Sequence, residues 1–245
     1  MLVHILAVGF LLGHSHINIM KDKRILFVGG NQGMGLAAAK IASSQGSEII
    51  ISGRNESKLK DIAEKAFNNK AGYFSCDAGN PDSVRKMLQT LQPISDIVVT
   101  ATGNKVSASS ILKTPTELAQ QAFQGFWISY NIVHTAKEYM QRNGSITLIS
   151  GSSAKTPGEG WGFWGISQGS INALVRFGSL ELAPIRLNAI SPGGIGLKNP
   201  DRQLSEHRGT PEDVGQMIIA LIANPHVTGA IIDVDGGERQ GHWNG

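Results

Sequence analysis

A glycine-rich turn is the first feature of the sequence that could do chemistry. The apolar run 25–28 (ILFV) leads directly into the turn 29–35 (GGNQGMG), and a good helix-forming sequence follows at 36–40. Glycine permits a tight turn from strand to helix and lets a pyrophosphate approach the backbone, while free N–H groups at the start of a helix favour anions. Glycine-rich turns also recur without ligands, but this one has the strand before it and the helix after it that favour a nucleotide-binding site.

The residues after the second predicted strand indicate which dinucleotide the turn would hold. The strand 48–52 (EIIIS) ends at Ser52 and is followed by Gly53 and Arg54. Gly53 stands where an acidic residue would bind the 2′-OH of an NAD ribose. Arginine can instead hold a 2′-phosphate through paired charge-assisted hydrogen bonds. Arg54, with Ser52, therefore favours NADP(H). The alternative for Arg54 is a solvated residue at the start of a helix.

The elements that must position these residues alternate between strand and helix. Strands are predicted at 25–28, 48–52, 72–75, 96–101, 145–150, 185–191 and 230–234. Helices are predicted from the turn onward at 36–40, and at 56–67, 81–91, 116–142, 165–182 and 211–223. Strict alternation predicts an α/β fold, a doubly wound parallel sheet of about seven strands with right-handed crossovers.

Length and composition agree with one globular domain. The 245 residues can bury a large core, and contents of 41% hydrophobic and 17% charged residues exclude wholesale disorder. A formal net charge of +3, without a long run of Lys or Arg, argues against nucleic acid as the main partner. The single Cys76 cannot form an internal disulfide, so a cytoplasmic location is expected. No metal site is predicted.

The first nineteen residues lie outside the alternating pattern. Residues 2–12 are apolar, but the segment is too short to span a bilayer and lacks the charged residues that open a secretory signal. Met20 begins a stretch that could open a cytosolic domain. We therefore predict an upstream extension at 1–19, a domain at 20–245 and no membrane partner; a membrane or partner anchor is the alternative for the extension.

Ordered motifs along the chain carry a family resemblance. They are 29–35 (GGNQGMG), Gly53-Arg54, 181–193 (ELAPIRLNAISPG), 208–214 (RGTPEDV) and 234–237 (VDGG). On these motifs the stretch 21–237 resembles the short-chain dehydrogenase/reductase family. The resemblance implies a single-domain Rossmann fold, a dinucleotide cofactor and hydride transfer to or from a small carbonyl or alcohol substrate.

The resemblance also implies a set of cofactor-binding residues. Asp77 stands where the family has its adenine-contacting aspartate, with a cap for the helix at 81–91 as the alternative. The segment 100–103 (TATG) takes the place of the family's NNAG. The candidate cofactor-binding residues are Gly29, Asn31, Gln32, Gly33, Met34, Gly35, Ser52, Arg54, Asn55, Asp77, Ala101, Thr102, Gly103 and Ile195.

The catalytic residues of the family have no counterparts in this sequence. The family reacts through a tyrosine, a lysine four residues later and a serine, and the resemblance aligns these with Trp164, Gln168 and Gly151. An indole N–H is a donor without an accessible pKa, and a glutamine amide carries no charge. The asparagine of the family's proton relay aligns near Gly125. No catalytic residue is therefore assigned.

The substrate side of the resemblance differs as well. Only the short segment 194–207 stands where the family has a longer lid, and Leu197 replaces the threonine that follows the family's PGxI. A short lid leaves the pocket more open to water. Trp161 takes the tyrosine position of an enoyl-reductase-like spacing, and with Phe163 and Trp164 it either fills core volume or lines a ligand site.

Two functions follow from these observations. One is an NADP(H)-dependent carbonyl or alcohol oxidoreductase with substitute groups. The candidates for such groups are Ser150, Ser152, Ser153, Lys155 and Lys105. The other is a non-catalytic NADP(H)-binding sensor, or an inactive subunit beside an active relative.

Self-association is the remaining expectation. The helix at 165–182 carries more apolar residues than one sheet face should cover, which favours a homodimer or homotetramer. These residues are Ile166, Ile171, Leu174, Val175 and Leu180. The alternative is that all of them belong to the intramolecular core.

Overall fold

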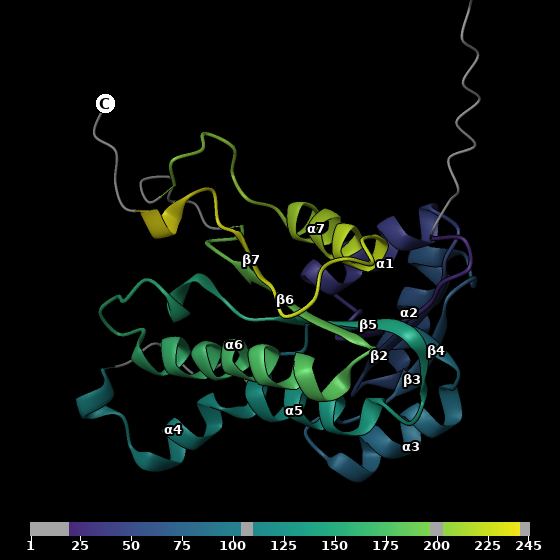
Figure 1. The fold of residues 1–245 in the computed structure, drawn as a ribbon, viewed down its shortest axis with the longest axis horizontal. Helices are drawn as coiled ribbons and strands as arrows, with labels where there is room; N and C mark the ends of the chain where they lie inside the picture. The colour runs from purple at the N-terminus through teal and green to yellow at the C-terminus, as the bar shows by residue number, and fades with distance from the viewer. Residues whose placement is uncertain (1–19, 104–109, 197–202, 241–245) are drawn as a thin grey trace, which may run out of the picture.

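Seven parallel strands form one sheet in the order β3-β2-β1-β4-β5-β6-β7 in the computed structural model, which describes residues 20–103, 110–196 and 203–240 (Figure 1). The strands are β1 Arg24–Val28, β2 Glu48–Gly53, β3 Gly72–Ser75, β4 Ile94–Val99, β5 Met140–Ile149, β6 Arg186–Pro192 and β7 Ile231–Val234. The helices are α1 Gly33–Ser44, α2 Glu56–Phe67, α3 Pro81–Leu91, α4 Thr116–Ala122, α5 Gln124–Ala136, α6 Gly162–Leu182 and α7 Pro211–Ala223. Short 3-10 helices are η1 Ile111–Lys113, η2 Ser152–Ala154 and η4 Glu238–Gln240.

Both faces of the sheet are covered by helices, and apolar side chains of the buried strands pack on both sides of it. In β1, Leu26 and Val28 face the core shared with α3, α5 and α6, whereas Ile25 and Phe27 face the core shared with α1, α2 and α7. Figure 1 shows these two helix layers on opposite sides of the sheet. The prediction of a single α/β domain with a doubly wound sheet is confirmed.

The strand order reverses between β1 and β4, which opens a crevice at their carboxyl ends. The chain after β4 bends toward β1, where the Val28 carbonyl accepts hydrogen bonds from the N–H groups of Thr100 and Ala101. The predicted strand 96–101 therefore ends earlier, at Val99. Thr100 and Ala101 line the crevice instead.

The long helix predicted at 116–142 is wrong in two places. It is divided at Phe123 into α4 and α5, and a Cβ placed on Gly125, in the first turn of α5, would lie 3.2 Å from the carbonyl oxygen of Thr102. The chain is already extended at Met140, which pairs with Ile94 of β4. Pairing with a neighbouring strand has overridden the local preference of this segment for helix.

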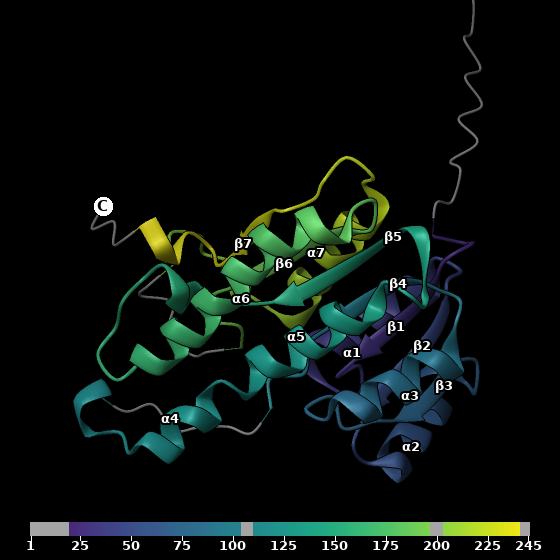
Figure 2. The same cartoon turned by 60° about the horizontal axis from the view of Figure 1, so that its bottom comes forward.

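The remaining element boundaries agree with the prediction within a few residues. The largest shifts are at β5, which begins at Met140 rather than at residue 145, and at α1, which ends at Ser44 rather than at residue 40. Figure 2 brings the neighbouring helices α5 and α6 to the near side of the sheet, with α4 projecting beyond them. Within the described ranges, none of the helices combines the length and the apolar character that a membrane span requires. The predicted extension 1–19 lies outside the described residues.

Candidate functional site

A cleft of about 450 Å³ opens where the strand order reverses. Residues from the turn before α1, the ends of β2 and β4, and the starts of α2 and α5 line it. Of the predicted cofactor-binding residues, the lining includes Gly29, Asn31, Gln32, Gly33, Met34, Gly35, Arg54, Asn55, Asp77, Ala101, Thr102 and Gly103. Further lining residues are Val28, Gly53, Lys58, Cys76, Ala78, Thr100, Gln124 and Ile128.

Glycine is needed at different positions of the turn for different physical reasons. A Cβ on Gly29, which has φ +93°, would lie 2.6 Å from the backbone nitrogen of Ala101, and a Cβ on Gly35 would lie 2.6 Å from the Gly29 carbonyl oxygen. These two glycines let the turn pack against the end of β4. Gly33, with φ +52°, has nothing within 4 Å of its Cβ position. Its open side is the space that an anionic group could fill.

The N terminus of α1 points its unsatisfied N–H groups toward the same space. Gln32 is the N-cap residue, but its side chain makes no capping hydrogen bond. The first N–H groups of a helix have no intrahelical partner, and the helix dipole adds positive potential there. The turn and the start of α1 together therefore form an anion-binding cradle.

Two cationic side chains lie at the end of the cleft formed by β2 and α2. Arg54 and Lys58 both line the cleft and both are exposed. Asn55 between them is the N-cap of α2, and its side-chain oxygen accepts hydrogen bonds from the Lys58 N–H and the Ser57 hydroxyl. The Lys58 ammonium donates to Gln32 Oε1 at 2.8 Å, across the cleft. Lys58 was not among the residues predicted from the sequence, although its position four residues after Arg54, in the first turn of a predicted helix, was a usable signal.

Asp77 lines the cleft two residues after the end of β3. Its Oδ1 accepts the Gly79 N–H at 3.1 Å. The cap of α3 is Asn80, whose side chain accepts from Asp82 and Ser83, so the alternative of Asp77 as that cap is wrong. Cys76, beside it, also lines the cleft, and burial raises the pKa of its thiol. The thiol is therefore neutral at pH 7.

Two of the predicted cofactor residues lie away from the lining of the cleft. The Ser52 side chain is fully buried, and its hydroxyl contacts the Met87 sulfur at 3.2 Å. Ile195 packs against the core on the α7 side, where its Cδ1 would lie 2.9 Å from a Cβ on Gly209. The Ile195 segment is held in place by the Gly194 N–H, which donates to the Glu238 carboxylate at 3.1 Å.

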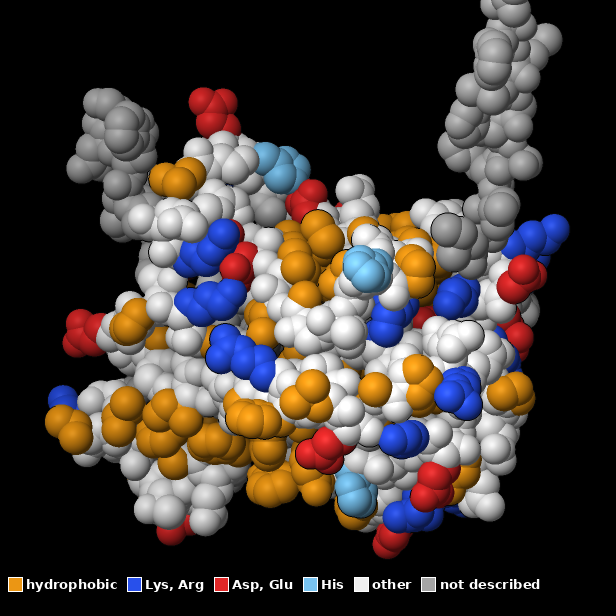
Figure 3. Space-filling view, in the orientation of Figure 1, with side chains coloured by type: hydrophobic (Ala, Val, Ile, Leu, Met, Phe, Trp, Pro, Cys, Tyr) orange, Lys and Arg blue, Asp and Glu red, His pale blue; other side chains and the backbone are white. Residues whose placement is uncertain are grey.

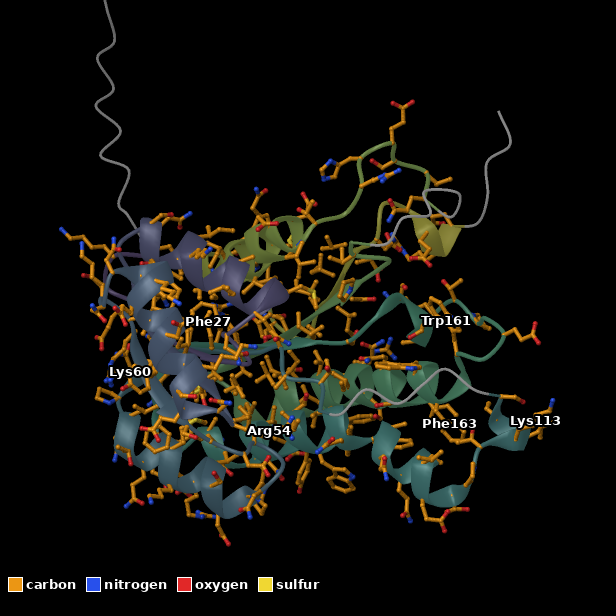
Figure 4. All side chains as sticks on the ribbon, turned by 180° about the vertical axis from the view of Figure 1, so that it is seen from behind. Phe27, Arg54, Lys60, Lys113, Trp161 and Phe163 are labelled. Atoms are coloured by element: carbon orange, nitrogen blue, oxygen red, sulfur yellow. The ribbon has the colours of Figure 1, made fainter. Side chains whose placement is uncertain are left out.

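The residues that the family resemblance aligns with the catalytic serine, tyrosine and lysine lie at the start of η2 and in the first turns of α6, outside the lining of the cleft. Gln168 is 8% exposed, and its Oε1 has no hydrogen-bond partner among the described residues. A Cβ on Gly151 would lie 3.4 Å from Gln168 Cγ, which is an ordinary contact. Trp164, one turn before Gln168, is partly buried. Figure 4 shows Trp161 and Phe163 near each other, well away from Arg54.

Three of the candidate substitute groups are paired or buried, and a fourth, Ser153, is partly buried. The Lys155 ammonium lies 2.7 Å from both oxygens of Asp233, which also pairs with Arg239 at 3.1 Å. Ser150 and Ser152 are buried, and the Ser150 hydroxyl has no partner in the described part of the chain. Lys105 and Leu197 lie outside the described residues. No described group of three His, Cys, Asp or Glu side chains is arranged to hold a metal ion.

The outer face of α6 is apolar, but not through all the residues expected. Ile171 and Val175 are buried in the intramolecular core, so counting them as surplus was wrong, and Leu174 packs against that core. Leu180 is 77% exposed and Ile166 is also exposed, together with Phe177 at 70%, which the sequence analysis missed. Figure 3 shows hydrophobic side chains gathered in a band over this face.

Comparisons with known proteins cover most of this chain. A family model described as enoyl-(acyl carrier protein) reductase matches residues 28–238. The chain is 30% identical over 248 residues to the short-chain dehydrogenase/reductase ATR9 of Stachybotrys chlorohalonatus, covering 89% of this chain and 97% of that protein.

Solved structures show the same fold. The reductase/Diels-Alderase MalC from Malbranchea aurantiaca superposes with a TM-score of 0.82 at 22% identity, over 91% of this chain and 98% of that one. BdcA, solved in complex with NADPH, has a TM-score of 0.80 at 21% identity, over 89% of this chain and 95% of that one.

Proposed function

The chain belongs to the short-chain dehydrogenase/reductase family of NAD(P)-dependent oxidoreductases, and we propose that its cleft binds NADP(H). One observation carries the proposal. The glycine turn, the uncapped start of α1 and Arg54 line a single cleft, and Gly53 stands where an acidic residue would hold an NAD ribose. The open side of Gly33 gives the pyrophosphate room, and Arg54 gives a 2′-phosphate a bidentate partner.

Ser52 and Arg54, the two residues at the end of β2 that were expected to favour NADP(H), have different roles in this proposal. The Ser52 hydroxyl contacts Met87 in the core, so Arg54 would recognise the 2′-phosphate without it. Asp77 and Asn31 line the walls on either side, where polar groups can hydrogen-bond the adenosine. Ile195, beside the far end of the site, remains a proposed contact of the nicotinamide side.

A binding titration tests the cofactor assignment. We expect NADPH to bind more tightly than NADH, and Arg54→Asp to weaken NADPH by about tenfold or more, since it removes a charge-assisted pair and adds a like charge beside the phosphate. Lys113→Asp, which changes a cation on η1 outside the cleft lining, is the matched control. Equal affinities for both cofactors that ignore Arg54→Asp would contradict the assignment.

We further propose that hydride transfer by this protein is weak or atypical. When bound, the nicotinamide would supply the hydride. Trp164, Gln168 and Gly151 take the positions of the family's tyrosine, lysine and serine, so the protein would lack a titratable donor and the cation that tunes it. Lys155 is a poor substitute, because the Asp233 carboxylate holds its ammonium. Orientation of a carbonyl or alcohol substrate beside the cofactor still lowers the barrier by several kcal/mol.

The second candidate function is a non-catalytic NADP(H)-binding sensor, or an inactive subunit of a hetero-oligomer. The buried, uncharged Gln168 favours it, because no charge is available there to activate a neighbour. A panel of aldehydes and ketones, followed at the nicotinamide absorbance, distinguishes the two. Turnover above the protein-free rate supports the enzyme, whereas NADPH binding without turnover of any member supports the sensor.

Self-association is part of the proposal. Phe177 and Leu180 lie exposed on the outer face of α6, where a second copy would bury them in a homodimer or homotetramer. The cytoplasmic location expected from the single Cys76 stays a prediction.

A further inference from the structure

A hydrogen bond across the cleft joins Lys58 of α2 to Gln32 at the start of α1. Gln32 is the N-cap of α1, yet its side chain caps nothing and its Oε1 accepts from the Lys58 ammonium at 2.8 Å. Lys58 is in the first turn of α2, four residues beyond Arg54, and both cations line the cleft. The structure therefore places a second positive charge at the end where Arg54 stands.

We propose that Lys58 is a second cation that selects the 2′-phosphate of NADP(H), and that Gln32 is a neutral latch that holds it in the free protein. This inference rests on the proposed NADP(H) function and adds to it a specificity residue and its resting partner. When NADP(H) binds, the Lys58 ammonium would give up its hydrogen bond to the neutral Gln32 amide and would donate to the 2′-phosphate instead. The Gln32 side chain would then be released.

The surroundings of Lys58 favour this exchange. Its partner is an uncharged amide at an exposed position, and a charged phosphate is the stronger acceptor for an ammonium group. The side-chain oxygen of Asn55 already caps α2, so it is not the acceptor for the cationic side chains of Arg54 and Lys58. Both cations can therefore bind an anion. Among the described residues that line the cleft, Asp77 is the only carboxylate, and the Gly79 N–H occupies one of its oxygens.

Lys60 offers a matched control on the same helix. It lies two residues from Lys58, about 200° around the helix axis, and it is exposed without lining the cleft. Figure 4 shows it toward the outer edge of the molecule, away from Arg54. Replacing either lysine by methionine removes one charge and retains an unbranched stem of similar length.

The test uses two adenosine fragments, because they report only on this end of the cleft. Adenosine 2′,5′-bisphosphate carries the 2′-phosphate and 5′-AMP does not. We expect Lys58→Met to weaken the bisphosphate by about tenfold, which is a common effect for a hydrogen bond to a charged group, and to leave 5′-AMP unchanged. Lys60→Met should change neither ligand, and Lys58→Arg should retain the preference for the bisphosphate.

Gln32 variants test the latch. Gln32→Glu should pair Lys58 more strongly and place a negative charge near the phosphate, so the bisphosphate should bind about tenfold more weakly while 5′-AMP changes less. Gln32→Leu frees Lys58 and should leave the bisphosphate bound equally or more tightly. A specific loss of bisphosphate affinity in Gln32→Leu would make Gln32 a ligand and overturn its role as a latch.

The outcomes separate this inference from the function on which it rests. If wild-type protein binds neither NADPH nor NADH, the proposed function fails. If it prefers NADPH but Lys58→Met leaves the ratio of bisphosphate to 5′-AMP affinity unchanged, the inference alone fails. An equal loss of both fragments in Lys58→Met also overturns it, because Lys58 would then only hold the glycine turn in place through Gln32.

Discussion

The two ends of the site differ in how strongly the fold constrains their residues. At the cofactor end, Gly29 and Gly35 pack against the end of β4 with no space for a side chain, so the turn is part of the core packing. At the chemical end, Gly151 has ordinary space around its Cβ position, and Gln168 fills a buried position without using its Oε1. The packing around the glycine turn therefore constrains its residues more strongly than the packing around Gly151 constrains that position.

The largest effect is expected from adding a methyl group at the cofactor end. Gly29→Ala forces a side chain at φ +93° onto the backbone nitrogen of Ala101, and we expect a loss of about 3 kcal/mol or more in the free energy of unfolding. Gly33→Ala is the comparison, because its methyl group meets nothing. It should lose about 1 kcal/mol from the left-handed backbone alone, yet weaken NADPH strongly.

Thermal melts with and without NADPH separate these two glycines. A ligand that binds only the folded protein raises the melting temperature, so Gly33→Ala should melt near wild type alone and lose most of the upward shift with NADPH. If Gly29→Ala instead melts like wild type, the claim that the fold enforces the turn is wrong.

The next largest effect is expected at the chemical end. Trp164→Tyr, Gln168→Lys and Gly151→Ser together should raise NADPH-dependent reduction of simple carbonyls by up to about a hundredfold, since a positioned acid–base group contributes that much or more. The gain depends on placement of the hydroxyl within about half an ångström. A lysine at the buried position 168 should also lower the melting temperature, because burial disfavours its charge.

Its control replaces the same three side chains without restoring the chemistry. Trp164→Phe, Gln168→Met and Gly151→Ala change similar volumes, and this variant should stay at the wild-type rate. Wild-type protein that already turns over a simple carbonyl at rates ordinary for an enzyme would show that another residue supplies the proton.

A smaller effect is expected on the outer face of α6, the helix whose inner face carries Gln168. Phe177→Glu should weaken self-association by about tenfold or more, because it places a charge in a contact that buries apolar surface. Light scattering across micromolar concentrations measures this effect. Lys60→Glu, on the opposite side of the sheet, should leave the assembly unchanged. Wild-type protein that is a monomer throughout the range would contradict the proposed oligomer.

The smallest effect is expected at the start of α7, where hydrogen bonds to Asp213 hold the preceding loop. Asp213 Oδ2 accepts from His207 Nε2 and from the Thr210 N–H, at 2.8 and 2.7 Å, and these hydrogen bonds hold the pKa of Asp213 below its usual range. A carboxyl whose pKa is lower in the folded state stabilises the protein above the unfolded pKa of about 3.9, and this stability is lost as pH falls through the folded pKa.

Asp213→Asn should therefore cost about 1 kcal/mol at pH 7, mainly through the capping box, or a few degrees of melting temperature. The difference from wild type should begin to shrink below about pH 4, where Asp213 of the unfolded chain becomes protonated, and should shrink further as pH falls through the lower pKa of Asp213 in the folded protein. Glu212→Gln, one residue earlier in the same helix turn, is the control. A difference that is constant from pH 7 to pH 3 would show that the charge of Asp213 has no role.

Helices and strands were predicted correctly where a local sequence signal agreed with the tertiary structure. Proline and acid at the start of α3 and α7 marked both helices, and the buried strands appeared as short apolar runs. The sequence was misleading at 137–142, where helix-forming residues continue after α5 but Met140 pairs with β4. Strand pairing depends on a neighbour 46 residues away in the chain, which no local pattern records.

The glycine turn and the Arg54 that follows β2 could both be recognised from residue types and spacing, whereas the proposed absence of the family's tyrosine and lysine rests on the alignment of motifs. Which side chains face the cleft was decided only by the tertiary structure. Ser52 points into the core because successive side chains of a strand alternate between the two faces of the sheet, and its face is covered by α3. Lys58 faces Gln32 because α2 and the start of α1 meet across the cleft, two helices that only the order of β1 and β2 in the sheet brings together.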